Sequence, residues 1–291
     1  MGQNQKGIIF SAIGELQYLE AALISIFTLR SLDPSIPIVL VTNFSGLSYK
    51  RLQQLSVETE EIFIPKSLRS QKIWESRLIK TLLFDISKFQ NTLYLDADIF
   101  TLNSISSIWD FLVAYQCCMC IDMLPTLSQC SHISTDEKSE TLKVCDEYSD
   151  HFNSGVLLWR KTTETRQLFY TWRKEWERFR KHDQLALLRA IKTTRTPINK
   201  LPYSYNYPYH WFPLDLAGIE PLSCLSSLKD QGIYFYHCFG GRVKRGHFKE
   251  ISEAVAPEAT QYAELLMKES LLSLIEKPGG KVLDILSLIN D

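Results

Sequence analysis

The first half of the chain contains short, continuous apolar runs separated by longer segments with mixed polarity. The runs occupy Gly7 to Ala12, Ile36 to Thr42 and Leu93 to Leu95, with a briefer one from Glu61 to Ile64. Uninterrupted apolar runs of this length are typical of parallel strands that are buried on both faces. The pattern therefore predicts a sheet whose strands lie in the interior of the protein.

The segments between these runs have apolar residues at helical spacing. Leucine, isoleucine and phenylalanine recur every three or four residues from Glu15 to Arg30, and Asp33-Pro34 ends the pattern. A short amphipathic segment spans Tyr49 to Leu55, and a longer one spans Ser70 to Ile86. This β-α-β-α-β order predicts an α/β protein with a parallel sheet and right-handed crossovers. Ligands of such sheets bind beyond the carboxyl ends of the strands.

The second half continues with both kinds of element. We expect strands at Gln116 to Ile121, at Phe152 to Trp159, which a small polar Asn-Ser-Gly turn opens, and at Gly232 to His237. The expected helices are Ser104 to Tyr115, Thr163 to Phe179, Gln184 to Ile191, Pro257 to Ile275 and Val282 to Ile289. Asp183 is placed to cap the helix that begins at Gln184.

Two stretches have no regular period. The segment from Met123 to Asp150 is polar, and a loop of that length is usually functional or mobile, although a solvated insertion without a role fits equally well. The segment from Leu201 to Pro213 is dense in aromatic residues and proline. Such rings stack on sugar faces or pack a loop onto the core, and packing is the simpler expectation for any single ring.

Composition narrows the class of protein. The 291 residues allow one large α/β domain or two smaller ones, and 45% hydrophobic with 22% charged residues is typical of a soluble globular chain. A formal net charge of −1 argues against bulk electrostatic binding of nucleic acid or an anionic membrane. No stretch approaches the ~20 apolar residues needed for a transmembrane helix. Residues Met1 to Gly7 are polar and too short for a signal peptide.

The cysteines add to this expectation. There are seven, an odd number, and Cys117, Cys118 and Cys120 lie together without the C-x-x-C spacing of a zinc site. The simplest interpretation is reduced thiols, several of which pack in the core. We therefore expect a cytoplasmic protein.

Two carboxylates follow the apolar run at Leu93 to Leu95. Asp96 and Asp98 are two positions apart, so an extended backbone points both side chains the same way. Neighbouring carboxylates repel unless a cation lies between them, and Mg²⁺ or Mn²⁺ with substrate phosphates would suit these ligands. A strand end with solvated acids is the alternative, but a buried strand delivering both acids favours the metal.

A histidine ends a later strand in the same manner. His237 is followed by Gly-Gly and by Arg242, Lys244 and Arg245. A lone histidine is more often structural than a ligand. Imidazole is nevertheless a good ligand for Mn²⁺, and the basic residues can neutralise a diphosphate. Together with the two acids, these residues indicate a site that stabilises a departing nucleoside diphosphate.

The motifs taken together resemble the GT-A nucleotide-sugar glycosyltransferases, especially glycosyltransferase family 8 of the glycogenin and bacterial galactosyltransferase type. A lone D-x-D is weak, but an ordered set of motifs across roughly residues 7 to 245 is specific. The set comprises Tyr18-Leu19, the R-x-x-K of Arg77 and Lys80, L-Y-L-D-A-D, F-N-S-G-V-L-L, D-Q-L at 183–185, L-P-x-x-Y-N at 201–206, and His237 with Gly240.

The resemblance implies a GT-A fold, with a mixed, mostly parallel central sheet flanked by helices. Residues 1–250 would form the nucleotide-sugar-binding catalytic domain, and residues 251–291 a helical C-terminal extension. The implied reaction moves a sugar from a nucleotide-diphosphate donor, a UDP-sugar, to an acceptor hydroxyl with retention of configuration, using Mn²⁺ or Mg²⁺. The acceptor could be a saccharide, a lipid-linked molecule or a protein, and we expect the segment from Met123 to Asp150 to help form its side of the site.

Site residues follow from the same resemblance, position by position. The implied metal ligands are Asp96, Asp98 and His237. The implied donor-binding residues are Ala12, Tyr18, Arg77, Lys80, Asp96, Asn153, Ser154, Gly155, Gly240 and Lys244. The residues implied at the reacting sugar are Asp122, Asp183 and Gln184, with Gln184 beneath the anomeric carbon.

The chain departs from the family pattern in two places. The family commonly continues from its histidine to Gly and then Lys-Pro-Trp, whereas here Lys244 comes one position late and Pro-Trp is missing. The usual D-Q-D is D-Q-L at Asp183 to Leu185. These differences bear on the diphosphate contacts and on the donor sugar, and leave the fold prediction unchanged.

Two other classes use the same acids. Haloacid-dehalogenase phosphatases also place D-x-D after an apolar strand. Their motif has Thr or Val where this chain has Phe100, and it usually lies near the N-terminus. A catalytically silent sugar-nucleotide binder is the second alternative, because ligands do not prove turnover. Phosphate release from a phosphomonoester would favour the phosphatase. UDP-sugar binding without transfer or hydrolysis would favour the silent binder.

Overall fold

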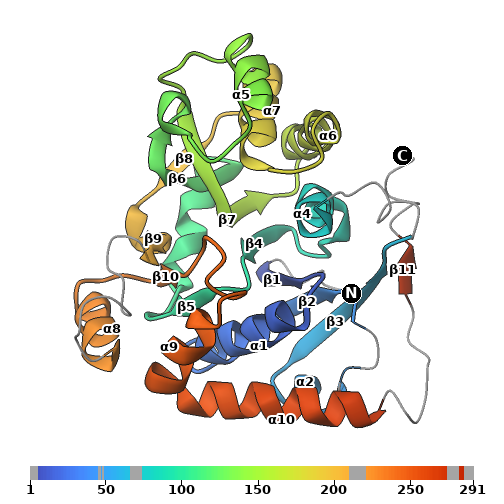
Figure 1. The fold of residues 1–291 in the computed structure, drawn as a ribbon, viewed down its shortest axis with the longest axis vertical. Helices are drawn as coiled ribbons and strands as arrows, with labels where there is room; N and C mark the ends of the chain where they lie inside the picture. The colour runs from blue at the N-terminus through green and yellow to red at the C-terminus, as the bar shows by residue number, and fades with distance from the viewer. Residues whose placement is uncertain are drawn as a thin grey trace.

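The computed structural model describes residues 6–44, 47, 49–65, 74–209, 221–273 and 282–284. Its main strands are β1 (Lys6–Ala12), β2 (Ile38–Thr42), β3 (Val57–Phe63), β4 (Asn91–Leu95), β6 (Cys117–Thr126), β7 (Asp150–Arg160), β8 (Asn199–Leu201) and β11 (Val282–Asp284). They form one sheet in the order β11-β3-β2-β1-β4-β7-β6-β8 (Figure 1). All neighbouring pairs are parallel except the two that involve β7, so the prediction of a mixed, mostly parallel sheet is confirmed.

A second, smaller sheet lies beside the first. It consists of β5 (Ile99–Thr101), β10 (Phe235–His237) and β9 (Tyr207–Pro208), in that order. Strand β10 runs antiparallel to β5 and parallel to β9. Because β5 follows β4 after only three residues, the small sheet is attached directly to the carboxyl end of a central strand of the large one.

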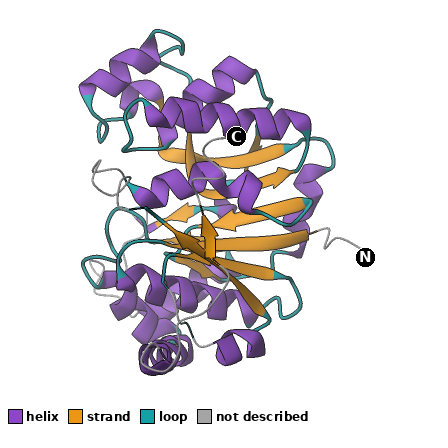
Figure 2. Ribbon diagram, turned by 90° about the vertical axis from the view of Figure 1, so that its right-hand side faces the viewer, coloured by secondary structure: helices purple, strands orange, loops and turns teal. Residues whose placement is uncertain are grey.

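Helices cover both faces of the large sheet (Figures 1 and 2). They are α1 (Leu16–Arg30), α2 (Tyr49–Gln54), α4 (Glu75–Ile86), α5 (Thr135–Leu142), α6 (Thr163–Glu177), α7 (Gln184–Thr194), α8 (Pro221–Asp230), α9 (His247–Val255) and α10 (Pro257–Ser273), with short 3₁₀ turns η1 (Ser106–Leu112), η2 (Leu127–Gln129) and η3 (Tyr203–Tyr205). None of the helices in the described ranges is both long and apolar enough to span a membrane.

The alternation of side chains along β1 explains the layers. Ile8 and Phe10 belong to the core cluster that contains the apolar faces of α1, α9 and α10. Ile9, between them, belongs to the opposite cluster, which contains those of α4, α6 and α7. A strand buried on both faces needs apolar residues at every position, and this accounts for the uninterrupted run in the sequence. All seven cysteines are free and buried, so the prediction that they pack in the core is confirmed.

Several local expectations were wrong. Val282–Asp284 is a strand that pairs with β3, not the start of a helix, and residues 285–289 lie outside the described part. The Asn-Ser-Gly segment lies within β7 rather than in a turn before it. Residues Ser106–Leu112 form a 3₁₀ helix in place of the longer helix expected from Ser104 to Tyr115.

The segment from Met123 to Asp150 is not one long loop. Strand β6 continues through its first four residues, and η2 and the helix α5 follow. Ser134 caps α5, accepting a hydrogen bond from the backbone N–H of Glu137. The helix was missed because it is short and polar, and so lacks an apolar period.

The aromatic segment after Leu201 packs onto the core as far as it is described. Tyr205 stacks on Tyr234 with ring centres 4.3 Å apart, and the buried ring of Tyr209 lies beneath the guanidinium of Arg242. Residues 210–213 lie outside the described part, as do residues 70–73 of the helix expected from Ser70.

Candidate functional site

The two sheets meet at the end of β4. The backbone N–H of Asp96, the first residue after β4, donates to the carbonyl of Gly155 in the neighbouring β7 at 2.8 Å. Since β7 runs antiparallel to β4, its early residues lie at the carboxyl edge of the parallel strands. This topology brings Asn153, Ser154 and Gly155 to the same edge as Asp96.

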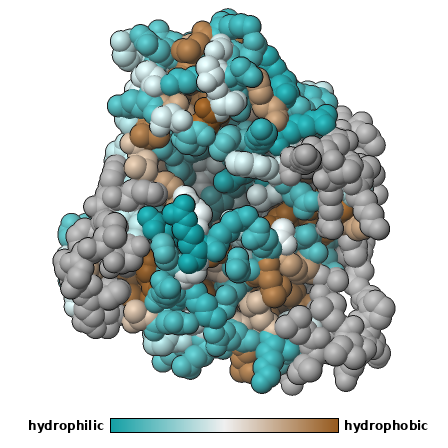
Figure 3. Space-filling view, viewed as in Figure 1, coloured by the Kyte–Doolittle hydropathy of each residue, from teal (hydrophilic) through white to brown (hydrophobic). Residues whose placement is uncertain are grey.

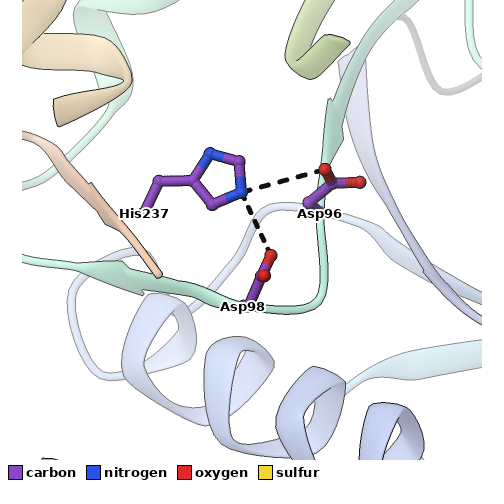
Figure 4. A group of neighbouring side chains, drawn as sticks. All are labelled: Asp96, Asp98 and His237. Carbon is purple, nitrogen blue, oxygen red and sulfur yellow. Dashed lines mark hydrogen bonds and ion pairs between the residues drawn. The ribbon is translucent and has the colours of Figure 1, made fainter. Parts of the chain in front are cut away.

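The small sheet brings the histidine to the acids. His237 in β10 pairs with Ile99 in β5, and the N–H of Cys238 donates to the carbonyl of Asp98 at 2.8 Å. The Nε2 atom of His237 lies 3.1 Å from Oδ1 of Asp98 and 3.8 Å from Oδ2 of Asp96 (Figure 4). The ligand atoms of these three residues all lie within 4.8 Å of one another, a set that could hold a metal ion.

A chain of amides fixes the orientation of the imidazole. The N–H of Gly155 donates to Oδ1 of Asn153 at 2.9 Å, so this oxygen is an acceptor. The Nδ2 group of Asn206 donates to the same oxygen at 3.0 Å, which turns Oδ1 of Asn206 toward Nδ1 of His237 at 2.7 Å. Nδ1 therefore donates to Asn206, and Nε2 faces the two aspartates.

This arrangement fits a divalent cation. Two carboxylates that lie this close together repel unless positive charge lies between them. Two carboxylate oxygens with one imidazole nitrogen suit a metal such as Mn²⁺, and Asn206 fixes the ring from behind. Gly155 makes the close approach possible: an added Cβ would lie 2.3 Å from Cε1 of His237 and 2.9 Å from Oδ2 of Asp96.

Two cations on one face of α4 reach the same edge. The ammonium of Lys80 is buried and lies 2.8 Å from Oδ1 and 2.9 Å from Oδ2 of Asp96. Burial alone would raise the pKa of Asp96, but Lys80, His237 and Arg77 lower it to about 2. Asp96 is therefore a carboxylate at neutral pH. Tyr94 donates a further hydrogen bond to its Oδ1 at 2.7 Å.

Asp183 binds the second cation rather than capping a helix. It precedes α7, but its side chain makes no capping hydrogen bond, so that prediction was wrong. Its carboxylate accepts from the hydroxyl of Ser154 at 2.5 Å and pairs with Arg77 at 3.3 Å. Burial would raise the pKa of Asp183, and Arg77, Lys80 and Ser154 lower it.

A second polar group lies on the other side of Asn153. Oδ2 of Asp122 accepts from Nδ2 of Asn153 at 2.8 Å and from Nε2 of Gln184 at 3.0 Å. These groups border a small open hollow lined by Ile121, Asp122, Met123, Asn153, Tyr203, Asn206, Pro208 and Phe239. Figure 3 shows hydrophilic residues around the middle of the molecular face seen in Figure 1.

The remaining predicted residues lie at the rim. Ala12 ends β1, and its carbonyl accepts from the hydroxyl of Thr42 at 3.0 Å. Burial and the charge of Asp98 raise the pKa of Tyr18, which is evidence that this phenol lies near the acids. Lys244 pairs with Glu15 at 2.5 Å. Gly240 has a φ of 82°, the left-handed region that favours glycine.

Asn206 is the main residue of this site that the sequence did not assign. It belongs to the L-P-x-x-Y-N motif, but nothing in the motif indicates that its amide orients His237. Ser11 was also missed: its hydroxyl lies 2.9 Å from that of Tyr94, which in turn bonds Asp96. In both cases the partner is distant in the sequence, so the spacing of residues does not predict the contact.

Comparison with known proteins places the chain in a family. The sequence matches the model of glycosyl transferase family 8 over residues 17–220, more than half of its length. This span contains Arg77, Lys80, Asp96, Asp98 and the polar residues of β7. No curated protein matches the sequence.

Solved structures share the fold at low identity. The galactosyltransferase LgtC, in complex with donor and acceptor sugar analogs, is 15% identical with a TM-score of 0.57, and the match covers 86% of this chain and 96% of that one. The bifunctional glycosyltransferase WbbM is 12% identical with a TM-score of 0.59, over 93% of this chain and 52% of that one. GlyE of Streptococcus pneumoniae TIGR4 is 15% identical with a TM-score of 0.53, over 96% and 66%. At these identities the comparison establishes a shared fold.

Proposed function

This chain belongs to glycosyl transferase family 8 and is a glycosyltransferase of GT-A fold, and on that premise we propose that it transfers a sugar from a UDP-sugar to an acceptor hydroxyl, with retention and with a divalent cation, Mn²⁺ or Mg²⁺. The observation that carries the proposal is the convergence of Asp96, Asp98 and Nε2 of His237 from two sheets. The family and fold support a nucleotide-sugar donor, and the ligand set supports the metal.

The proposed metal site consists of Asp96, Asp98 and His237. A bound divalent cation would supply positive charge that stabilises the diphosphate as it departs. Lys80 keeps Asp96 ionised, and the amide chain through Asn206 holds the imidazole with Nε2 facing the acids. Both effects prepare the ligands before the donor binds, so little reorganisation is needed at the moment of reaction.

The donor is proposed to lie along the carboxyl edge of the sheet. Ala12 and Tyr18 would border the nucleoside, and Arg77 with Lys244 would face the phosphates. The backbones of Gly155 and Gly240 would leave room for close approach. Lys244 is exposed and bonded to Glu15, so it can exchange this surface partner for a phosphate at little cost.

The reacting sugar is proposed to bind between two acids. The polar groups available to its hydroxyls come from Asp122, Asn153, Ser154 and Asp183. Nε2 of Gln184 donates both to Asp122 and to the carbonyl of Phe152, at 3.0 and 3.2 Å. Since both contacts use the amide nitrogen, the amide oxygen is left to face the anomeric carbon and steady its developing positive charge. The acceptor hydroxyl would approach from the hollow beside Asp122.

The test is metal-dependent UDP release from a panel of UDP-sugars, with and without Mn²⁺. Asp98→Ala removes a ligand from the partly exposed segment that follows the end of β4, where the Asp98 side chain is 15% exposed. We expect this variant to lose at least about 100-fold in activity, the cost of losing a metal ligand. Asp110→Ala, which removes an exposed acid from η1, is the matched control and should retain full activity.

Each alternative gives a different result. Normal activity in Asp98→Ala would rule out the metal site. A wild-type protein that binds UDP-sugars in the presence of Mn²⁺ but neither transfers nor hydrolyses them would be a silent binder. Release of phosphate from phosphomonoesters would indicate the phosphatase.

A further inference from the structure

A separate cluster of possible metal ligands lies beside Asp122, whose Oδ1 is 3.9 Å from Nδ1 of His151. Cys130 follows η2, His132 follows two residues later, and His151 is the second residue of β7. His182, just before α7, lies next to His132. The proposed transfer reaction uses none of these four side chains.

The thiol of Cys130 lies between two imidazoles. Its Sγ is 3.9 Å from Nδ1 of His132 and 3.8 Å from Nε2 of His151. Sulfur and nitrogen ligands of one tetrahedral zinc ion are about 3.6 Å apart, given Zn–S and Zn–N bonds of about 2.3 and 2.0 Å. Both distances are therefore close to those of a metal site.

The buried histidine is held as a metal ligand should be. Nδ1 of His151 lies 2.9 Å from the carbonyl oxygen of Leu124, which can only accept, so Nδ1 carries the proton. Nε2 therefore directs its lone pair at the thiol of Cys130. A backbone carbonyl that fixes the distal nitrogen is the usual outer-shell partner of a metal-bound histidine.

We propose that Cys130, His132 and His151 form a second metal site, which takes Zn²⁺ or a similar transition-metal ion. One sulfur and two imidazole nitrogens are soft or borderline ligands, unlike the carboxylate-rich set at Asp96 and Asp98, so the two sites would select different ions. On binding, Cys130 loses its thiol proton to solvent and coordinates as the thiolate. The ion would tie the segment that carries α5 to β7.

Binding requires one small movement. Unlike those of Asp96, Asp98 and His237, the ligand atoms of the three residues do not all lie within 4.8 Å of one another. The ring centres of His132 and His151 are 6.0 Å apart, against about 5 Å for two imidazoles on one tetrahedral ion. His132 is exposed, so its ring can turn inward without disturbing the core. His182, whose ring centre is 5.5 Å from that of His132, is the candidate for the fourth position.

Cobalt provides a direct test, because a thiolate bound to Co²⁺ gives a charge-transfer absorption band that the carboxylate and imidazole ligands at Asp96, Asp98 and His237 cannot give. The full-length chain is stripped with a chelator and titrated with Co²⁺ alone. We expect a thiolate band that saturates as Co²⁺ is added and is displaced by Zn²⁺. The same band should form in Cys145→Ala, the matched control, which removes a buried cysteine of the same small apolar cluster.

The variants decide the assignment. Cys130→Ala should lose the band, and His132→Ala, at an exposed position, should fold normally and bind Co²⁺ about 100-fold more weakly. Absence of the band in the wild type, or its survival in Cys130→Ala, would overturn the proposal. If Cys130→Ala does not fold, His132→Ala is decisive, since an unchanged Co²⁺ affinity in that variant contradicts the site. None of these readouts depends on glycosyl transfer.

Discussion

At the scale of single residues, one backbone N–H sets the chemistry of the candidate donor site. The N–H of Gly155 donates to Oδ1 of Asn153, so this oxygen also accepts from the amide nitrogen of Asn206. The amide oxygen of Asn206 then accepts from Nδ1 of His237. The other nitrogen, Nε2, thereby faces the aspartates. A single amide turned the other way would break the chain of donors and acceptors.

Gly155→Ala tests how tightly this arrangement is packed. The added methyl group would lie 2.3 Å from the imidazole of His237, so the ring must move away from the acids. We expect Mn²⁺ affinity to fall by about 10- to 100-fold, measured by calorimetric titration of the full-length protein.

Gly232→Ala is the control for this substitution. A Cβ at Gly232 meets nothing within 4 Å, although the φ of 78° makes any side chain there cost about 1 kcal/mol. This variant should lose some stability and keep its Mn²⁺ affinity. Equal Mn²⁺ affinities in Gly155→Ala and the wild type would show that His237 is not a ligand.

The metal-binding candidates could be predicted from the sequence, whereas the residues that orient them could not. Asp96 and Asp98 end a buried strand, and this pattern is visible in the chain itself. Asn206 acts on His237 through a contact across 31 positions, between segments that meet only in the folded sheet. Asp183 was placed correctly before a helix, but its preference for Arg77 and Ser154 over the helix end depends on tertiary contacts.

At the scale of elements, apolar runs predicted the central strands well because these strands are buried on both faces. The direction of β7 could not be predicted, since an antiparallel strand and a parallel strand of equal burial have the same apolar pattern. The polar helix α5 was missed because it has no apolar period. It packs on α7 through a buried ion pair, Glu137 with Arg189 at 3.3 Å, rather than through an apolar face.

This ion pair gives a pH dependence of known sign. Burial raises the pKa of Glu137 above 4.5, and Arg189 offsets only part of that shift. The folded state therefore holds this proton more tightly than the unfolded state. The stability that the protonated Glu137 contributes is fully present below about pH 4.5 and is lost as the pH rises through the raised pKa. The free energy of unfolding of the wild type, relative to Glu137→Gln, should fall as the pH rises from about 4.5 to 7.

Urea unfolding across that pH range measures the difference. Glu140→Gln is the control on the same helix, because Lys143 lowers the pKa of Glu140, so its contribution is present above pH 4.5 and lost at lower pH. Between about pH 4.5 and 7 the Glu140→Gln difference should therefore stay nearly level while the Glu137→Gln difference falls. A flat or rising difference for Glu137→Gln would contradict the raised pKa of Glu137.

The hollow beside Asp122 leads to a prediction about the acceptor. Tyr203 in η3 is 39% exposed and lines this hollow. If the acceptor binds there, Tyr203→Ala should raise the acceptor KM about 10-fold and leave hydrolysis of the donor unchanged. Tyr170→Ala, on α6, removes a tyrosine of similar exposure that does not line the hollow and is the control. An acceptor KM that is the same in both variants would place the acceptor elsewhere.

At the scale of the whole molecule, the candidate site exists only where the two sheets join. Strand β4 of the large sheet supplies Asp96, and β10 of the small sheet supplies His237, which is 141 positions later in the chain. We propose that residues 1–250 form the catalytic domain and that 251–291 extend it. This proposal is supported by α10, which packs on α1 with Tyr262 beside Phe27 at 5.3 Å between ring centres. The sequence pattern does not predict which strands are neighbours in the two sheets, because their pairing depends on contacts between segments far apart in the chain.

The most direct test of the central claim is calorimetric titration of the protein with UDP, with and without Mn²⁺. If a cation held by Asp96, Asp98 and His237 bridges to the diphosphate, UDP should bind at least 10-fold more tightly with Mn²⁺, and Asp98→Ala should abolish that gain. UDP binding of equal strength in the presence and absence of Mn²⁺ would contradict the account.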